Sequence, residues 1–338
     1  MSASPSVLFL TVAGAGAGLG HVKRCAALGS ALARHGASVR FAVAGDPERL
    51  TTMGMNLPGL EPLQWTRSPR LAVDTVARSR PDVVVVDAYD ATDELLRTLR
   101  SSGGFIAAID DLADRELPVD LVVNRASKAQ RRPYADVPGR RLLLGPRYAL
   151  LDQGFENVPV RATRPMPSRV LVTLGGEDAE LKLTEAVSTV EGALPEASID
   201  VVAGLFARSA PPRGPRVRLH RGLPSLYDLL LSADFAVTAA GMTLYECLAA
   251  GTPAVAVPVA DNQRPDFVEL TDAGLVVAGQ PDLAAAVERL SRDAALREEL
   301  AARGRALVDG RGAARVAAEL ISAVAQAAAS AGPVRGAR

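Results

Sequence analysis

A histidine that follows a glycine-rich turn is the first residue whose type and position could do chemistry. Residues 13–24 read Ala-Gly-Ala-Gly-Ala-Gly-Leu-Gly-His-Val-Lys-Arg, which places His21 at the expected start of a helix. Glycines let a backbone approach a ligand closely, and the free N–H groups of a helix start bind anions. The positive end of the helix dipole favours a neutral imidazole that can accept a proton, although such a histidine can also be a surface residue without a task. Lys23 and Arg24 could neutralise phosphates, or only face solvent.

Two further glycine turns follow predicted strands in the second half of the chain. Residues 173–178 read Thr-Leu-Gly-Gly-Glu-Asp, and residues 239–246 read Ala-Ala-Gly-Met-Thr-Leu-Tyr-Glu. Two helix N-termini from one lobe could hold a diphosphate without a metal ion. Glu246 could accept hydrogen bonds from both hydroxyls of a ribose, although acids are favoured in a first helical turn on structural grounds as well.

Polar side chains also follow several predicted strands, at the edge of a parallel sheet where ligands collect. They are Asp87, Tyr89, Asp110, Asp111, Asn262 and Gln263. The position of Asp87 and Tyr89 favours a functional role. For Asp110 and Asp111 helix capping explains the position equally well, and no third ligand accompanies them, so a metal site is not predicted.

Short apolar runs alternate with longer amphipathic stretches, which predicts parallel sheets covered by helices. Strands are expected at residues 7–12, 39–43, 82–87, 105–109, 121–124, 169–174, 199–203, 235–238 and 254–258. The valine-rich run at 82–87 is apolar on both faces, as a buried parallel strand requires. Helices are expected at 21–35 and over most of the alanine-rich stretch 281–330.

The alternation stops once, where Pro159, Pro165 and Pro167 interrupt a stretch without apolar periodicity. We therefore expect an N-terminal lobe at 1–150, a linker at 151–167, a C-terminal lobe at 168–330 and a flexible tail at 331–338. A proline-rich linker also predicts that the lobes close on binding a ligand.

The composition excludes several classes of protein. Lys plus Arg and Asp plus Glu number 38 each, so the chain has no electrostatic footprint for nucleic acid or a membrane surface. The two cysteines, Cys25 and Cys247, lie too far apart in the sequence to suggest a disulfide framework or a metal site. The N-terminus lacks the positive start of a signal peptide, and its apolar run is too short to span a bilayer. We expect a cytoplasmic protein without membrane insertion.

Several short segments together, in order, resemble one known family. They are residues 18–25, 86–89, 109–112, 144–151, 173–178, 239–246 and 261–263. Through them the chain is similar to the UDP-sugar hydrolases of pseudaminic acid biosynthesis and their spore-coat polysaccharide relatives. That family belongs to the GT-B glycosyltransferase-like superfamily, with the enzyme that adds N-acetylglucosamine to the peptidoglycan lipid precursor. The resemblance implies the α/β GT-B fold, in which two Rossmann-like lobes with parallel sheets face a central cleft.

The resemblance also implies roles for residues of both lobes. His21 would be the catalytic histidine, acting on the attacking water over the anomeric carbon, with Asp87 as its support. The sugar would be contacted by Gly20, Arg24, Tyr89, Asn262 and Gln263. The nucleotide would be held by Gly175, Gly176, Leu223, Gly241, Met242, Thr243 and Glu246. The family uses no metal ion or cofactor, because helix ends stabilise the departing diphosphate.

The chain departs from the family at a few positions. Residues 152–155 read Asp-Gln-Gly-Phe, where the family usually carries an arginine and then an acid before the phenylalanine. Glu177 and Lys182 stand where small or amide residues are commoner, and Met242 replaces a small polar residue. These positions lie near the lobe junction and the phosphate loop, so the sugar and the acceptor stay open.

We expect an enzyme that breaks the anomeric C–O bond of a UDP-linked, N-acetylated or deoxygenated sugar, with water as the favoured acceptor. The alternative is a glycosyltransferase with a small-molecule acceptor, such as a natural product or a glycan precursor. The fold cannot decide between them. A binding protein with a decayed site is disfavoured by the intact His21, Asp87 and Glu246. A Rossmann dehydrogenase, with Asp46 on a ribose, is disfavoured by the mismatched glycine spacing.

Overall fold

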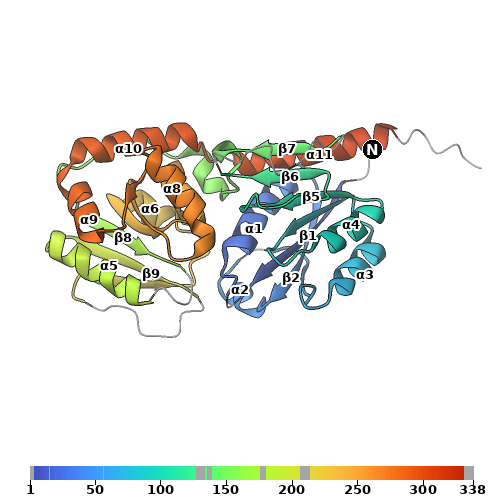
Figure 1. Ribbon diagram of the computed structural model, residues 1–338, viewed down its shortest axis with the longest axis horizontal. Helices are drawn as coiled ribbons and strands as arrows, with labels where there is room; N and C mark the ends of the chain where they lie inside the picture. The colour runs from blue at the N-terminus through green and yellow to red at the C-terminus, as the bar shows by residue number, and fades with distance from the viewer. Residues whose placement is uncertain are drawn as a thin grey trace, which may run out of the picture.

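Two parallel β-sheets organise the chain, and helices cover them (Figure 1). The computed structural model describes residues 4–14, 16–55, 57–126, 134, 139–175, 180–205 and 214–330. In Figure 1 the lobe built on the first sheet lies on the right and the lobe built on the second sheet lies on the left. The predicted α/β class with two parallel-sheet lobes is therefore confirmed.

The N-terminal lobe is built on a sheet whose strand order is β3-β2-β1-β4-β5-β6-β7. Its strands are β1 (Ser6–Ala13), β2 (Ser38–Gly45), β3 (Leu60–Pro62), β4 (Val83–Asp87), β5 (Phe105–Ile109), β6 (Leu121–Asn124) and β7 (Arg141–Leu144). Its helices are α1 (Gly20–Arg34), α2 (Glu48–Thr52), α3 (Pro69–Ser79) and α4 (Asp93–Ser101). The strand order reverses between β1 and β4, so the loops that follow these two strands diverge and leave a crevice.

The C-terminal lobe repeats this plan, with the strand order β10-β9-β8-β11-β12-β13. Its strands are β8 (Arg169–Thr173), β9 (Ser198–Ala203), β10 (Val217–Arg221), β11 (Phe235–Ala239), β12 (Ala254–Val257) and β13 (Val277–Ala278). Its helices are α5 (Glu180–Ala193), α6 (Tyr227–Ser232), α7 (Met242–Ala250), η3 (Asp261–Gln263), α8 (Arg264–Asp272), α9 (Leu283–Arg292) and α10 (Ala294–Leu307). The order reverses here between β8 and β11.

Alternation along the buried strands distributes apolar side chains to both faces of each sheet. In β1, Val7 and Phe9 pack with α1 on one face, whereas Leu8 and Leu10 pack with α3 and α4 on the other. Successive side chains of a strand point to opposite faces, so a sheet covered on both sides needs apolar residues at every position. Each such side chain contributes about 1.5–3 kcal/mol on burial.

The last helix, α11 (Gly312–Ser330), belongs to a different lobe from the one predicted. The sequence assigned residues 168–330 to the C-terminal lobe, but Val316 and Leu320 are fully buried in the α1 core of the N-terminal lobe. Figure 1 shows α11 in red along the N-terminal lobe, beyond the end of α10. An apolar helical stripe packs wherever it is best covered, and here α1 covers it.

The chain therefore crosses between the lobes twice, and the crossings pack against each other. The first crossing contains the short helices η1 (Pro146–Tyr148) and η2 (Gln153–Asn157). A Cβ atom on Gly310 would lie 1.9 Å from the carbonyl oxygen of Phe155, and one on Gly312 would lie 2.1 Å from that of Ala149. Only glycine allows this approach, because real Cβ atoms never come so close to a backbone oxygen.

The predicted linker at 151–167 is packed onto the C-terminal lobe. Leu151 and Phe155 are buried in the core of that lobe. The Arg161 guanidinium donates to the backbone carbonyl of Ala233 at 3.1 Å. Closure of the lobes about this segment stays a prediction.

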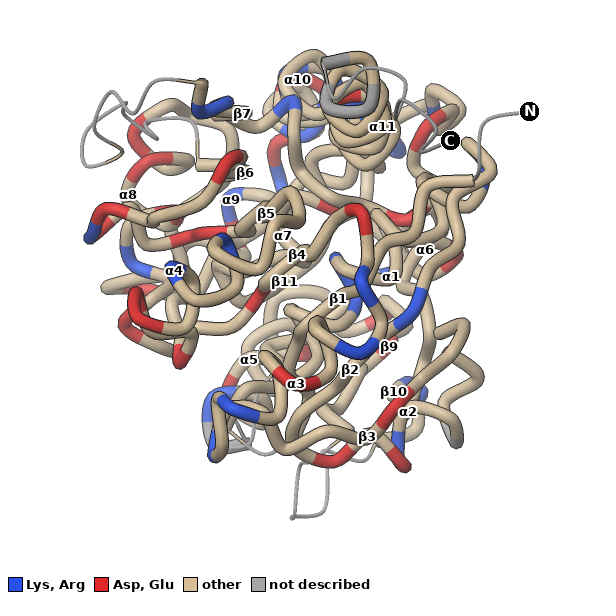
Figure 2. The backbone as a smooth tube through the Cα atoms, turned by 90° about the vertical axis from the view of Figure 1, so that its right-hand side faces the viewer, with Lys and Arg blue, Asp and Glu red and all other residues tan. Residues whose placement is uncertain are grey.

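Charged residues of both signs are spread over the surface. Figure 2, which faces the N-terminal lobe, shows Lys and Arg interspersed with Asp and Glu along the chain. None of the described helices combines the length and the apolar character needed to cross a membrane. The predicted tail at 331–338 lies outside the described residues.

Candidate active site

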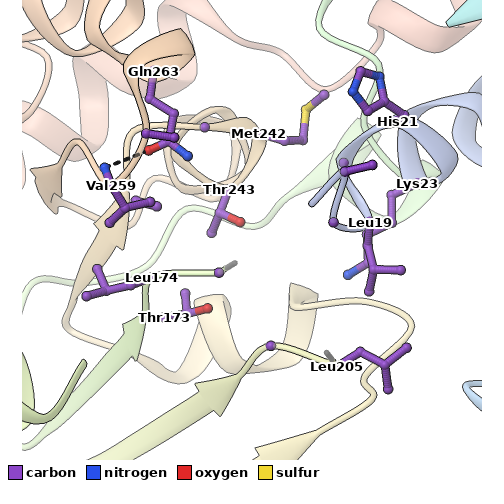
Figure 3. A pocket seen from close by; sticks show the side chains of 18 of the residues that line it. Leu19, His21, Lys23, Thr173, Leu174, Leu205, Met242, Thr243, Val259 and Gln263 are labelled. Carbon is purple, nitrogen blue, oxygen red and sulfur yellow. Dashed lines mark hydrogen bonds between the residues drawn. The ribbon is translucent and has the colours of Figure 1, made fainter. Parts of the chain in front are cut away.

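A pocket of about 440 Å³ lies where the strand order of both sheets reverses. Its lining comes from the turns after β1 and β8, from the start of α7 and from the segment that follows β12. Both lobes therefore present the carboxyl ends of their central strands to one cavity, the place where open α/β sheets bind ligands. Figure 3 shows side chains of α1 and of the C-terminal lobe around this pocket.

The pocket brings together nearly all residues that the sequence singled out. Those that line it are Gly20, His21, Arg24, Tyr89, Gly175, Leu223, Gly241, Met242, Thr243, Glu246, Asn262 and Gln263. Asp87 lies directly behind this lining, in contact with His21. Gly176 lies outside the described residues, as does Glu177.

His21 is held by a buried carboxylate. Its Nδ1 atom lies 2.7 Å from Oδ1 of Asp87, and Arg24 donates to both Asp87 oxygens at 2.6 Å. Burial raises the pKa of Asp87, but Arg24 and His21 outweigh this effect and lower it. Because the carboxylate stays ionised, we assign the imidazole proton to Nδ1, which leaves Nε2 free to accept a proton. Nη2 of Arg24 also lies 3.1 Å from Nδ1, but the contact with Asp87 is the shorter one.

Tyr89 connects this histidine to the second lobe. Its ring meets the His21 ring edge to face, with the centroids 4.7 Å apart. Its hydroxyl donates to Asp111 at 3.2 Å and accepts from Nδ2 of Asn262 at 3.1 Å. Burial, followed by the charge of Asp111, raises the pKa of Tyr89 to about 12, so the phenol stays protonated.

The two neighbouring acids after β5, Asp110 and Asp111, have different roles. Asp110 accepts from the backbone N–H groups of Leu112 and Ala113, which is a turn-capping role. Asp111 lines the pocket and accepts from the Arg24 guanidinium. The sequence left a capping role and a functional role open for both residues. The capping role fits Asp110, whereas Asp111 is part of the pocket.

Sequence reasoning missed two charged residues of the pocket, Arg125 and Asp266. Arg125 donates to Asp111 and, at 3.0 Å, to Asp266 of the other lobe. Arg125 directly follows β6, so the rule that ligands collect at strand ends could have found it. Asp266 stands in the first turn of α8, where an acid has a sufficient structural explanation, and its sequence position gives no further signal.

The wall opposite His21 is the start of α7. Its N-cap residue is Gly241, and no side chain caps the helix, so its first N–H groups are open to an anion. Met242 and Thr243 form the first turn, and in Figure 3 both project toward the pocket. Gln263 closes this wall on one side, where its Oε1 accepts from the backbone N–H of Val259 at 3.1 Å.

Glu246 lies one turn further into α7 and is 9% exposed. Burial raises its pKa, and the positive charge of Lys23 and a hydrogen bond from Thr243 oppose this effect only in part. Lys23 reaches across from α1, and its Nζ donates to the carbonyl of Leu223 at 3.4 Å. Lys23 therefore acts on both Leu223, which is predicted to contact the nucleotide base, and Glu246, which is predicted to bind the ribose.

Of the residues that set this chain apart in sequence, Met242 lines the pocket and Lys182 lies in α5. Gly175 has a φ of +59° and free space where a Cβ would be, so its backbone is exposed to the pocket. Nζ of Lys182 donates to the carbonyl of Pro258 at 3.4 Å, which ties α5 to the end of β12. Metal independence and the individual residue roles stay predictions.

Comparison with known proteins gives distant relatives. No protein-family model matches the chain. An uncharacterized protein of Methanocaldococcus jannaschii is 21% identical and aligns over 73% of this chain and 54% of its own length, so the chain spans about half of that relative. SpsG of Bacillus subtilis, a spore coat polysaccharide biosynthesis protein, is 24% identical over 71% of this chain and 76% of that protein.

A third relative is a sugar transferase of Mycobacterium bovis. It is named UDP-N-acetylglucosamine--N-acetylmuramyl-(pentapeptide) pyrophosphoryl-undecaprenol N-acetylglucosamine transferase. It is 29% identical over 89% of this chain and 81% of that protein.

Solved structures match both lobes. The glycosyltransferase SnogD from Streptomyces nogalater has a TM-score of 0.63 at 24% identity, over 95% of this chain and 100% of that one. A complex of S. aureus MnaA with UDP has a TM-score of 0.67 at 11% identity, over 95% and 97%. The chain therefore has the two-lobed GT-B fold of the solved glycosyltransferase structures. The expected hydrolase finds no support among these proteins, whereas the alternative, a glycosyltransferase, does.

Proposed function

We propose that the protein transfers a sugar from a UDP-sugar to a hydroxyl group of a small-molecule acceptor. One observation carries the proposal. Across a single pocket, a histidine bound to Asp87 faces a helix N-terminus that no side chain caps. The first can take a proton, and the second can bind a diphosphate. The similarity to the Mycobacterium bovis UDP-N-acetylglucosamine transferase and to the MnaA complex with UDP supports UDP as the nucleotide.

The reaction needs a base on the acceptor side. Nε2 of His21 takes the proton of the acceptor hydroxyl while its oxygen attacks the anomeric carbon. The new C–O bond forms as the bond to the diphosphate oxygen breaks, and the electron pair of that bond leaves with UDP. Asp87 keeps the proton on Nδ1 and stabilises the imidazolium that results. A positioned general base contributes about 10²–10⁴-fold to the rate.

The departing diphosphate is stabilised from the second lobe. The N–H groups at the start of α7, that of Thr243 among them, would hold its oxygens, with Gly175 on the other side. Glu246 would accept from the ribose hydroxyls, and the backbone at Leu223 would meet the base. These donors act without a metal ion in this proposal.

The sugar would lie between the two walls, against Gly20, Tyr89, Asn262 and Gln263. Arg24 receives a different role from the one expected. Its guanidinium is taken up by Asp87 and Asp111, so it fixes the carboxylate behind His21 in place of contacting the sugar. Water in place of the acceptor hydroxyl would give the hydrolase that the sequence favoured, through the same steps.

The test is release of free UDP from a panel of UDP-linked amino and deoxy sugars. Release is measured without an acceptor and again with a pool of hydroxyl-bearing small molecules. We expect release to depend on the pool and a glycosylated product to appear by mass spectrometry. Equal release in its absence would make water the acceptor. A protein whose melting temperature does not respond to UDP or to any of the sugars would contradict the proposal.

A further inference from the structure

A continuous row of charged side chains leads away from His21 along the first sheet. Asp87 contacts His21 at 2.7 Å, and Arg24 donates to Asp87 at 2.6 Å. Arg24 and Arg125 both donate to Asp111. Asp87, Asp111 and Arg125 stand at or just after the ends of β4, β5 and β6, which are neighbours in the sheet, and Arg24 projects from α1. The charges alternate in sign, so each arginine lies between two carboxylates.

Arg125 is the member of the row that reaches the other lobe. Its Nη2 donates to Asp266 of α8 at 3.0 Å, and both side chains are 10% exposed. The Arg125 guanidinium lies 4.8 Å from the ring centroid of Tyr245, whose hydroxyl donates to Asp266 at 3.2 Å. Within the described part of the chain, Nε of Arg125 is buried without a hydrogen-bond partner. The guanidinium is thus held by two carboxylates and a ring, from both lobes at once.

A second contact across the cleft ends on the same carboxylate. Asn262 of the C-terminal lobe donates to the Tyr89 hydroxyl, which in turn donates to Asp111. The Tyr89 ring also packs against His21. Two independent contacts between the lobes therefore converge on Asp111, the residue that shares Arg24 with Asp87.

We propose that Arg125 is a positioning residue, which passes the contact between the lobes to His21 through Asp111, Arg24 and Asp87. The part that concerns turnover rests on the proposed function. The effect of Arg125 on the orientation of His21 depends only on geometry and charge, and it does not depend on which reaction the protein catalyses.

The physical reason is competition for Arg24. Burial raises the pKa of Asp111, but Arg125 and then Arg24 outweigh this and hold it well below its usual range. Without Arg125, the ionised Asp111 keeps Arg24 as its remaining arginine partner and draws it away from Asp87. Asp87 then orients the imidazole less firmly, since one guanidinium cannot hold both carboxylates equally well.

The experiment observes His21 directly. The chain contains 3 histidines, so ¹⁵N-labelled imidazole resonances can be assigned with His21→Gln as the reference. We expect the wild type to show a proton on Nδ1 of His21. In Arg125→Met this resonance should shift and broaden, and in Arg125→Lys it should return in part. Arg34→Gln is the matched control. Arg34 is the last residue of α1, the helix that carries His21, and its guanidinium donates to Gln153 and Glu156 of the first crossing.

Asp266→Asn keeps the arginine and the shape of the contact, so it carries the test if Arg125→Met does not fold. Because Asp266→Asn leaves Arg125 to Asp111 alone, Asp111 should compete less for Arg24. The His21 resonance should therefore move opposite to its shift in Arg125→Met, and the double variant should resemble Arg125→Met. Turnover of Arg125→Met should fall about 10-fold while UDP affinity stays within about 3-fold.

An unchanged His21 resonance in both variants, or fully additive effects, would overturn the proposal. If the resonance moves as expected but the wild type releases no UDP with any acceptor, the proposed function fails and the positioning role stands.

Discussion

The two walls of the pocket are built from different groups. The N-terminal wall consists of ionised side chains that pair with one another, with His21 between Asp87 and the pocket. The C-terminal wall consists of backbone N–H groups at the start of α7, small, apolar and amide-bearing residues, and two buried acids, Glu246 and Asp266. Both walls stand at equivalent places in two sheets of the same topology.

In the proposed sugar transfer, this difference divides the work between the two lobes. Paired charges fix a side chain that must give and take a proton, because each carboxylate and guanidinium restrains the next. Backbone N–H groups bind an anion and release it again, since their positive end is fixed by the helix and needs no counter-ion. Under the proposed function, the first lobe would transfer the proton and the second would bind the nucleotide.

The largest effect is expected from Asp87→Asn, which breaks the N-terminal wall. The amide cannot stabilise an imidazolium, and it leaves the buried Arg24 without one of its carboxylates. Turnover should fall by about 10²–10⁴-fold. The free energy of unfolding should fall by about 3–5 kcal/mol. Initial rates and urea unfolding measure the two effects.

Asp90→Asn is the matched control for this variant. Asp90 is exposed, three residues further along the same loop. Its replacement should leave turnover and stability unchanged. Full activity in Asp87→Asn would show that the carboxylate behind His21 is not needed.

Glu246→Gln tests the other wall and should change binding more than chemistry. Loss of the carboxylate should weaken UDP about 10-fold, while turnover at saturating substrate changes little. Titration calorimetry gives the affinity, and initial rates at high substrate give the turnover. An equal loss in both would mean that the two walls do not divide the work in this way.

The same variant has a pH signature with a definite sign. Burial raises the folded pKa of Glu246, so this residue favours the folded state most when it is protonated. Its contribution is present below the unfolded pKa, which is about 4.3, and declines as the pH rises through the folded pKa. Relative to Glu246→Gln, the wild type should therefore lose stability as the pH rises. Thermal unfolding at several pH values measures this difference, and parallel curves would contradict it.

The smallest effect is expected at Gly175. Its φ of +59° is a left-handed conformation, so Gly175→Ala should cost about 1–2 kcal/mol of stability although the site has free space. Gly192→Ala, inside α5, should instead stabilise the protein by up to about 1 kcal/mol. Urea unfolding compares the two. If Gly175→Ala changes neither the stability nor the UDP affinity, the left-handed conformation at Gly175 is needed neither for folding nor for UDP binding.

The central strands could be predicted from the sequence and the edge strands could not. The strands β5 (Phe105–Ile109) and β6 (Leu121–Asn124) match the prediction, because a strand buried on both faces is a continuous apolar run. The edge strand β10 (Val217–Arg221) reads Val-Arg-Leu-His-Arg and is largely exposed, so its pattern does not differ from that of a loop. The lobe on which α11 packs could not be predicted either, because an apolar stripe on a helix does not indicate which hydrophobic core will bury it.

The site divides in the same way. His21 and Asp87 were found because a glycine turn and a strand end mark their positions locally. The contact between Arg125 and Asp266 joins residues 141 positions apart on different lobes, and it exists only once both sheets are placed. Local rules find the residues at the end of one strand, but not which residues meet across a cleft.

The most direct test of the division between the walls is one paired measurement on His21→Gln. UDP affinity is measured by calorimetry and UDP release by initial rates, on the variant and the wild type. The account predicts that release falls by about 10²–10⁴-fold while UDP affinity stays within about 3-fold. Undiminished release, or loss of UDP binding together with release, would contradict it.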